Sequence, residues 1–305
     1  LMPHAEYWAK LIHKYFGFIP FFDMPAPVFT RSPFIAGLVL AIMMLVRRPI
    51  RQGFFRIPSL VRQGTLRRWQ LIGGLSGAFF VSTQSELVAV IGVAIFTVAA
   101  VAGQTSAALL VDKFGIGPAG KQPVTGMRIA AAVLGIVGVL VSVTGQDTQG
   151  QFAFGAVLAA FAAGAFVSTQ PALNGQIANH TGQPAAAALV NFIVGFLALI
   201  LVYGIKQQIS PIEFTVPPLP WENPIIWLGG TFGVIFVLTS AFMAKTLGVF
   251  LFTLTSVVGQ LSGAILMDLL FPTASTNLNW QLLLGISMTG LAVILASGKK
   301  KVKTP

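Results

Sequence analysis

The hydrophobic and polar positions of this chain fall into long blocks. Nine apolar runs lie between residues 33 and 297, separated by shorter polar connections. The runs do not alternate residue by residue as the strands of a β-barrel would, and apolar segments in lipid must satisfy their own backbone hydrogen bonds. Each run is therefore predicted to be a membrane-spanning helix. The predicted spans are 33–46, 69–84, 87–111, 124–144, 152–173, 184–205, 225–243, 247–270 and 280–297.

Three stretches interrupt this pattern. Residues 6–22 place aromatic side chains on one side and lysines on the other, which predicts an amphipathic helix at the membrane interface, with a disordered terminus as the alternative. Residues 47–68 carry seven arginines and are predicted to be a loop. Ser85 and Glu86 are predicted to break the apolar stretch 69–111 into two spans.

One pattern of apolar and polar residues occurs twice. When residues 73–112 are placed on residues 229–268, 17 of the 40 positions are identical. A match at a fixed long offset of 156 residues indicates a duplicated unit. The identical positions include Gly73, Gly74, Gly77, Gln104 and Asp112, which fall on Gly229, Gly230, Gly233, Gln260 and Asp268.

The duplication predicts two repeats, residues 32–150 and 151–298, between an atypical segment 1–31 and a basic tail 299–305. Residues 32–46 pair with residues 190–204, but nothing apolar in the first repeat pairs with 152–173. The parent unit is therefore predicted to have five helices. The first helix of the first copy is missing, diverged or replaced by the N-terminal segment.

Composition agrees with a membrane protein. Apolar residues make up 55% of the chain, charged residues 9%, and the mean hydropathy is +0.83, well outside the averages for soluble domains. The net charge of +11 is carried by the connections and the C-terminus, which excludes nucleic acid as the expected partner. The absence of cysteine excludes disulfides and thiolate metal sites.

The basic residues also predict an orientation. If the nine spans alternate across the membrane, one side receives fifteen Lys and Arg residues, and the other receives Lys206 alone between spans. The positive-inside rule makes the first side cytoplasmic, together with the C-terminus. Because five is odd, the second repeat enters the membrane opposite to the first. The prediction is an all-α inverted repeat with a pseudo-two-fold axis in the membrane plane.

The doubled glycine pattern, the Gly-Gln pair and the aspartate eight residues later resemble the YdcZ-like group of the drug/metabolite transporter superfamily. Residues Gln170, Pro171 and Asn174, followed by Asn191 and Phe192, are also similar to that group. The resemblance covers about residues 32–297 and implies an inner-membrane carrier of small molecules with an EamA-like fold of ten helices. No glutamate lies in 152–173, where small multidrug-resistance pumps carry one, so the resemblance does not imply proton-coupled export of cations.

Polar residues inside the spans are the candidates for solute binding, because such residues are energetically unfavourable in lipid and are usually functional. Gln104 and Gln260 are paired by the repeat, and they either bind solute or hydrogen-bond neighbouring helices. Gln170, Asn174 and Asn191 are expected to line a cavity between the repeats, where Pro171 breaks a helix and frees backbone groups.

Asp112 and Asp268 lie near helix ends. They are predicted to cap neighbouring helices or to be solvated, with proton transfer or gating as the alternative. The four-residue spacing of Gly73 with Gly77, and of Gly229 with Gly233, predicts close helix packing.

These features predict a secondary-active transporter that works by alternating access of the two repeats. A channel or a non-transporting scaffold is the alternative. No constellation of catalytic or metal-ligating residues is evident, so no enzyme, cofactor or metal is predicted. The expected partners are a small-molecule substrate and the lipid bilayer, and a homodimer is left open.

Overall fold

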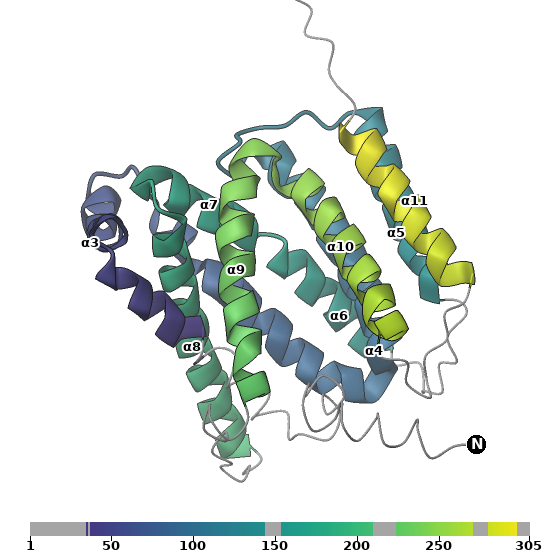
Figure 1. The fold of residues 1–305 in the computed structure, drawn as a ribbon, viewed down its shortest axis with the longest axis horizontal. Helices are drawn as coiled ribbons and strands as arrows, with labels where there is room; N and C mark the ends of the chain where they lie inside the picture. Colours follow the sequence, from purple (N-terminus) through teal and green to yellow (C-terminus); the bar gives the residue numbers. More distant parts are fainter. Residues whose placement is uncertain (1–34, 36, 144–153, 210–223, 271–279, 298–305) are drawn as a thin grey trace, which may run out of the picture.

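The computed structural model describes residues 35, 37–143, 154–209, 224–270 and 280–297 (Figure 1). Every regular element in these residues is a helix, as predicted. Three stretches are long and apolar enough to cross a membrane, namely Gly155–Thr181, Pro184–Val202 and Gly229–Thr246. Shorter apolar helices cover Gly37–Val46, Gly126–Gly138, Val249–Gln260 and Leu283–Ala296, and the count of nine spans stays a prediction.

Helix α4 (Gly73–Phe114) includes the predicted break at Ser85 and Glu86 without a helix end. The rings of Phe80 and Phe96 are 5.7 Å apart. Sixteen residues of straight helix would separate them by about 24 Å. Helix α4 therefore folds back on itself into two limbs, which meet near the lower edge of the bundle (Figure 1). The two apolar runs are distinct, but a bend separates them rather than a loop.

Helix α6 (Phe154–Val167) packs closely along α4. A Cβ atom added at Gly103 would overlap the carbonyl oxygen of Phe161, and one added at Gly164 would overlap the carbonyl oxygen of Ala100. Each helix therefore uses a glycine to admit the backbone of the other. Close approach of this kind is typical of helix pairs in membranes.

The span predicted at 152–173 is divided. Helix α6 ends at Val167, and α7 (Gln170–Thr181) begins after Ser168 and Thr169 with Pro171 in its first turn. Proline has no N–H to donate and is well tolerated at this position. Gly182 then ends α7 in the left-handed conformation, and α8 (Pro184–Ile209) follows.

The remaining helices are α5 (Gly126–Val143), α9 (Pro224–Thr246), α10 (Val249–Leu270) and α11 (Trp280–Ser297). Helices α5 and α11 lie along each other (Figure 1). They touch at Gly138, where an added Cβ would lie 2.7 Å from the carbonyl oxygen of Gly285 and 2.8 Å from Oγ1 of Thr289.

The arginine-rich stretch 47–68 is largely helical, so the predicted loop is wrong. Helix α3 (Arg48–Arg62) follows a short 3-10 helix, η1 (Met44–Val46), and precedes a second one, η2 (Arg68–Ile72). Gly53, Ile57 and Leu60 fall on one face of α3 and are buried against α7, α8 and Ala241 of α9. The arginines occupy the exposed face. The apolar residues recur with the period of a helix, although the high charge of the stretch hides this period in the sequence. The stretch therefore forms a helix with one buried face.

Several connections gather at one end of the bundle. Gln176 of α7 donates from Nε2 to the carbonyl oxygen of Ile116 in the α4–α5 connection, at 2.9 Å. Gly175 packs against Pro118 and Ala244, and Gly53 of α3 packs against Gln183. The α4–α5 connection, the α7–α8 junction, the α9–α10 turn and α3 therefore share an end, the upper one in Figure 1.

Candidate functional site

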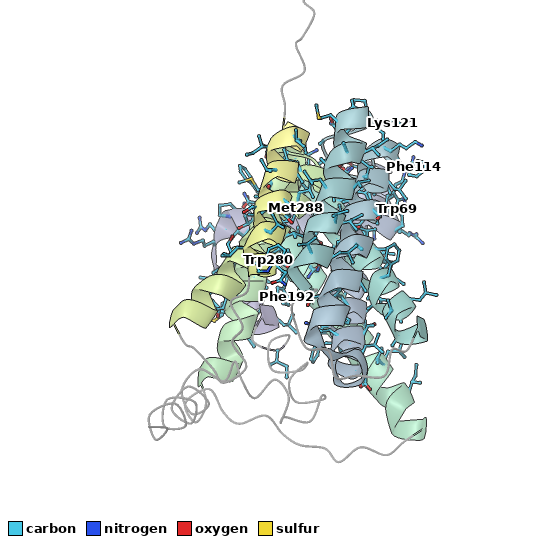
Figure 2. All side chains as sticks on the ribbon, turned by 90° about the vertical axis from the view of Figure 1, so that its right-hand side faces the viewer. Trp69, Phe114, Lys121, Phe192, Trp280 and Met288 are labelled. Atoms are coloured by element: carbon cyan, nitrogen blue, oxygen red, sulfur yellow. The ribbon has the colours of Figure 1, made fainter. Side chains whose placement is uncertain are left out.

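A central pocket of about 430 Å³ lies between the two halves of the chain. Its walls come from both limbs of α4, from the α6–α7 break, and from α8, α9 and α10. Phe192, on one wall, lies in the middle of the bundle, whereas Phe114 and Lys121 lie toward its upper end (Figure 2). This volume is within the range of about 300–1,000 Å³ that is usual for small-molecule sites.

Two pairs of phenylalanine rings line the pocket. Phe80 contacts Phe96 with ring centroids 5.7 Å apart, and Phe236 contacts Phe252 at 5.9 Å. An offset of 156 residues relates the two pairs position by position. The same contact is thus made once within the bent α4 and once between α9 and α10. The sequence alone did not single out these rings, although both pairs are identical in the repeat.

Gln104 and Gln260 both lie on the pocket wall, as the repeat predicts for a shared cavity. Gln104 is partly buried and Gln260 is exposed. Neither side-chain amide has a hydrogen-bond partner within the described part of the chain. Each amide therefore offers a donor and an acceptor to whatever occupies the pocket.

Gln170 and Asn191 lie on the same wall, but their amides are bonded to each other. Oδ1 of Asn191 accepts from Nε2 of Gln170 at 2.8 Å and from Nδ2 of Asn174 at 3.0 Å. Asn174 is fully buried behind the wall, and its own Oδ1 accepts no hydrogen bond in the described residues. This group links the start of α7 to α8.

The predicted packing glycines differ between the repeats. A Cβ at Gly73 would lie 2.9 Å from Oδ1 of Asn174, and a Cβ at Gly77 would lie 2.8 Å from Nε2 of Gln170. At Gly233 the nearest atom is Cζ of Phe192 at 3.4 Å, and Gly229 is exposed on the pocket wall. The first pair packs against α7, and Gly77 borders the cavity as Gly229 and Gly233 do.

Asp112, in the last turns of α4, is buried with 2% exposure. Its carboxylate accepts hydrogen bonds from the backbone N–H groups of Val249, at 2.8 Å, and Phe250, at 3.2 Å, at the start of α10. Carboxylates are favoured there because helix N-termini present free N–H groups and a positive dipole. Asp112 therefore caps α10, as predicted for an aspartate at a helix end.

Arg128 of α5 completes this arrangement. Its Nη2 lies 2.5 Å from Oδ2 of Asp112, and its guanidinium lies 5.0 Å from the ring centroid of Phe250. Gly248, at φ 77°, lies against the Asp112 carboxylate, where a Cβ would lie 2.9 Å from Oδ2. We call Asp112, Arg128 and the Val249 and Phe250 N–H groups the Asp112 cap. It joins α4, α5 and α10.

The Asp112 cap and the pocket occupy successive parts of the same helices. Buried apolar residues separate them, including Ala108, Val111 and Leu254. Buried apolar packing therefore closes the pocket toward the Asp112 end, and Gln260 and Gly229 of its wall are exposed. Asp268, the repeat equivalent of Asp112, belongs to α10, but its side chain lies outside the described residues.

Ionisable side chains are absent from the described pocket wall. The polar groups on that wall are the amides of Gln84, Gln104, Gln170, Asn191 and Gln260 and the hydroxyls of Thr97, Ser168, Thr253 and Ser256. The described residues also contain no group of three His, Cys, Asp or Glu side chains that would hold a metal ion. The site can exchange hydrogen bonds and apolar contacts with a bound molecule.

No protein with a curated description matches this chain. A family model, DMT_YdcZ, described as "Putative inner membrane exporter, YdcZ", matches two segments, residues 30–141 and 155–295. The glycine-rich repeat falls within these segments, and so do the described helices except for the ends of α5, α6 and α11. Exporters are not an enzyme class. The matched segments cover most of the chain, which therefore belongs to the YdcZ family of inner-membrane exporters.

Proposed function

We propose that the chain is a secondary transporter that exports a small molecule by alternating access of two inverted repeats. One observation carries this proposal: the central pocket is lined at equivalent positions of both repeats, and buried apolar residues separate it from the Asp112 end. A cavity reached from one side at a time is what a carrier needs, whereas a channel needs a continuous path.

The internal equivalence supports two related halves. The Phe80–Phe96 and Phe236–Phe252 contacts are repeated at an offset of 156 residues. One family model matches two separate segments of the chain. Helices α5 and α11, which occupy corresponding places in the two repeats, pack against each other. Opposite membrane orientation of the halves is the arrangement that we propose.

The sealed end is proposed to face the cytoplasm. Helix α3 with its exposed arginines, Lys113, Lys121 and Lys245 lie at the Asp112 end. Basic residues are concentrated on the cytoplasmic side of membrane proteins. The described conformation is then open outward, and release of the Asp112 cap would accompany opening toward the cytoplasm.

The chemistry of the pocket favours an uncharged solute. A charged solute would lose hydration without gaining a counter-ion on the described wall, at a penalty of several kcal/mol. The free amides of Gln104 and Gln260 suit hydroxyl, amide or carbonyl groups, and the phenylalanine rings suit an apolar or aromatic body. A small, neutral molecule with both features is the proposed substrate class.

Transport is tested with the purified protein in vesicles loaded with matched aromatic probes of different charge: benzamide, benzoate and benzylamine. The proposal expects saturable counterflow of benzamide. Saturable counterflow of only the charged probes would support a carrier but overturn the substrate class. A conductance that does not saturate would mark a channel instead.

The orientation is tested separately. The chain contains no cysteine, so a single introduced thiol is labelled without background. Ser59→Cys on α3 and Glu222→Cys in the stretch 206–224 are expected to react from opposite sides of the membrane. Reaction of both from the same side would contradict the inverted repeat.

A further inference from the structure

The two repeats differ in what covers them. In the first repeat, α6 and the turn after it cover one face of α4. The hydroxyls of Ser76 and Thr169 are 3.1 Å apart, and the rings of Phe79 and Phe166 are 5.7 Å apart. Gly103 admits the backbone of α6 at Phe161. Helix α6 and the turn after it thus bury the part of this face around Ser76 and Gly103.

The equivalent face of the second repeat lacks such a cover among the described residues. Phe232 is 62% exposed, whereas its equivalent Ser76 is 1% exposed. Ile235 and its equivalent Phe79 are exposed to similar extents, 52% and 45%. A Cβ at Gly259, equivalent to Gly103, would meet nothing within 4 Å. An apolar groove of about 460 Å³ lies beside these positions and includes Phe232, Ile235, Phe252 and Ser256. We call it the α9–α10 groove.

The groove has the form of a helix site because its counterpart holds a helix. Gly259 keeps the small residue that, at Gly103, lets α6 approach closely. Ser256 is equally small, and it stands where Ala100 meets Gly164 of α6. Small residues in this arrangement favour close helix contact over contact with loosely packed lipid.

We propose that residues 6–22, which lie outside the described part of the chain, dock as a helix in the α9–α10 groove, in the place that α6 takes on α4. The apolar positions of this segment, Trp8, Leu11, Ile12, Tyr15 and Ile19, follow the period of a helix face. Lys10, His13 and Lys14 fall on the opposite face. The long lysine side chains can reach the headgroup region from a helix at the edge of the bundle.

The point where the chain joins the bundle favours this occupant over a second copy. The helical residues Gly37–Val46 pack against Val234 and Val237 of α9, on the face of α9 opposite the groove. Gly37 itself lies against Phe192, and Phe192 lies against Gly233 of α9. Only 14 residues separate Phe22 from Gly37, so the tether keeps the segment beside the groove. A short tether raises the effective concentration to about millimolar.

Disulfide trapping in the full-length chain tests this proposal, because the chain has no cysteine of its own. Ile235→Cys is combined in turn with single cysteines at positions 8, 10, 11, 12, 13, 14 and 15, and the membranes are oxidised. An intramolecular disulfide is expected at one or two neighbouring positions among 8, 11, 12 and 15, because a disulfide needs Cα atoms within about 7 Å, and at none of 10, 13 and 14. The control replaces Ile235→Cys with Ser76→Cys, whose side chain is 1% exposed beneath the turn after α6, and is expected to give no crosslink to the segment.

Each other result overturns the proposal. A disulfide-linked dimer of Ile235→Cys alone would place a second copy in the groove. Crosslinks that do not distinguish the apolar from the polar positions would show that no fixed helix docks there. No crosslink at all would leave lipid as the cover. Labelling of Ile235→Cys by a membrane-permeant maleimide provides a second readout, which is expected to increase when residues 2–22 are deleted.

Discussion

The Asp112 cap and the central pocket lie on the same two helices, yet they use different chemistry. Asp112 and Gln104 are eight residues apart on α4, about 12 Å along the helix. At the cap, a buried carboxylate is satisfied by an arginine and two backbone N–H groups. At the pocket, uncharged amides face the cavity, and those of Gln84, Gln104 and Gln260 have no hydrogen-bond partner in the described residues.

The Asp112 cap therefore fixes the arrangement of the helices, whereas the pocket amides are available to bind a solute. A buried charge is tolerated only when it is paired and hydrogen-bonded, so the cap favours one arrangement of α4, α5 and α10. Neutral amides in the pocket form weaker hydrogen bonds, which a passing solute can exchange. The predictions below therefore separate loss of the helix arrangement from loss of the solute contacts.

The largest effect is expected at the cap. Asp112→Ala would remove the carboxylate partner of Arg128, which is 13% exposed and would keep only the carbonyl oxygen of Pro123, at 3.4 Å, as an acceptor. It would also leave two N–H groups of α10 without an acceptor, and it is expected to lower the free energy of unfolding by about 3–5 kcal/mol. Denaturation in mixed micelles measures this change. Lys113→Ala, at the exposed neighbouring position, serves as the control and is expected to stay close to the unchanged protein. Equal stability of the two variants would contradict a structural role of the Asp112 cap.

The next effect concerns the wall between α4 and α8. Gly74→Ala would push a Cβ into the carbonyl oxygen of Asn191 and toward N of Gly195, both backbone atoms that cannot turn aside. Overpacking of this kind is expected to lower stability by about 1–3 kcal/mol. The comparison variant is Gly233→Ala, whose Cβ would lie 3.4 Å from a ring atom of Phe192. If Gly233→Ala proved the more destabilising, the described contact of α4 with α8 would be wrong.

A smaller effect is expected for the paired amides. Gln104→Ala and Gln260→Ala should leave the protein folded in the membrane and weaken transport by up to about tenfold, since a neutral hydrogen bond contributes about 0.5–1.5 kcal/mol. Counterflow of benzamide, measured beside the unfolding free energy, separates the two effects. Unchanged transport in both variants would count against a role in binding, and a large loss of stability would indicate helix bonding instead.

The smallest effect is expected on the exposed face of α3. Arg56→Gln removes a charge at an exposed position and should change stability by less than about 0.5 kcal/mol. Arg128→Gln removes the same charge from the Asp112 cap and is expected to lower stability far more. Denaturation of both variants in the same micelles compares an exposed arginine with the arginine of the Asp112 cap. Similar losses of stability in the two variants would show that the ion pair of Arg128 with Asp112 does not stabilise the protein.

The sequence predicts features that lie within one stretch of the chain or in a match between two stretches. The pairing of Gln104 with Gln260 is visible in the sequence because it rests on a match between two stretches, and the structure brings both residues to one pocket. The helix α3 was not predicted because the seven arginines of the stretch 47–68 obscured a periodic apolar face. The signal was present in the spacing of Gly53, Ile57 and Leu60.

Other features had no local signal. Nothing near Asp112 in the chain indicates that its partners are the N–H groups of Val249 and Phe250, which are 137 and 138 residues away. The return of α4 upon itself is also invisible, because both limbs have the same apolar composition. The exposed state of Gly259 beside the buried state of Gly103 depends on which face α6 covers.

The sequence by itself determined that the chain is a helical membrane protein, that it contains a duplicated unit, and which family it resembles. These properties follow from composition, helical period and repeated letters, each of which can be read within one stretch or between two stretches. Only the tertiary structure decided which residues meet: the two phenylalanine pairs around one pocket, the carboxylate of α4 on the start of α10, and the uncovered groove. Such contacts depend on how helices from distant parts of the chain pack, and the pattern of any single segment does not record that packing.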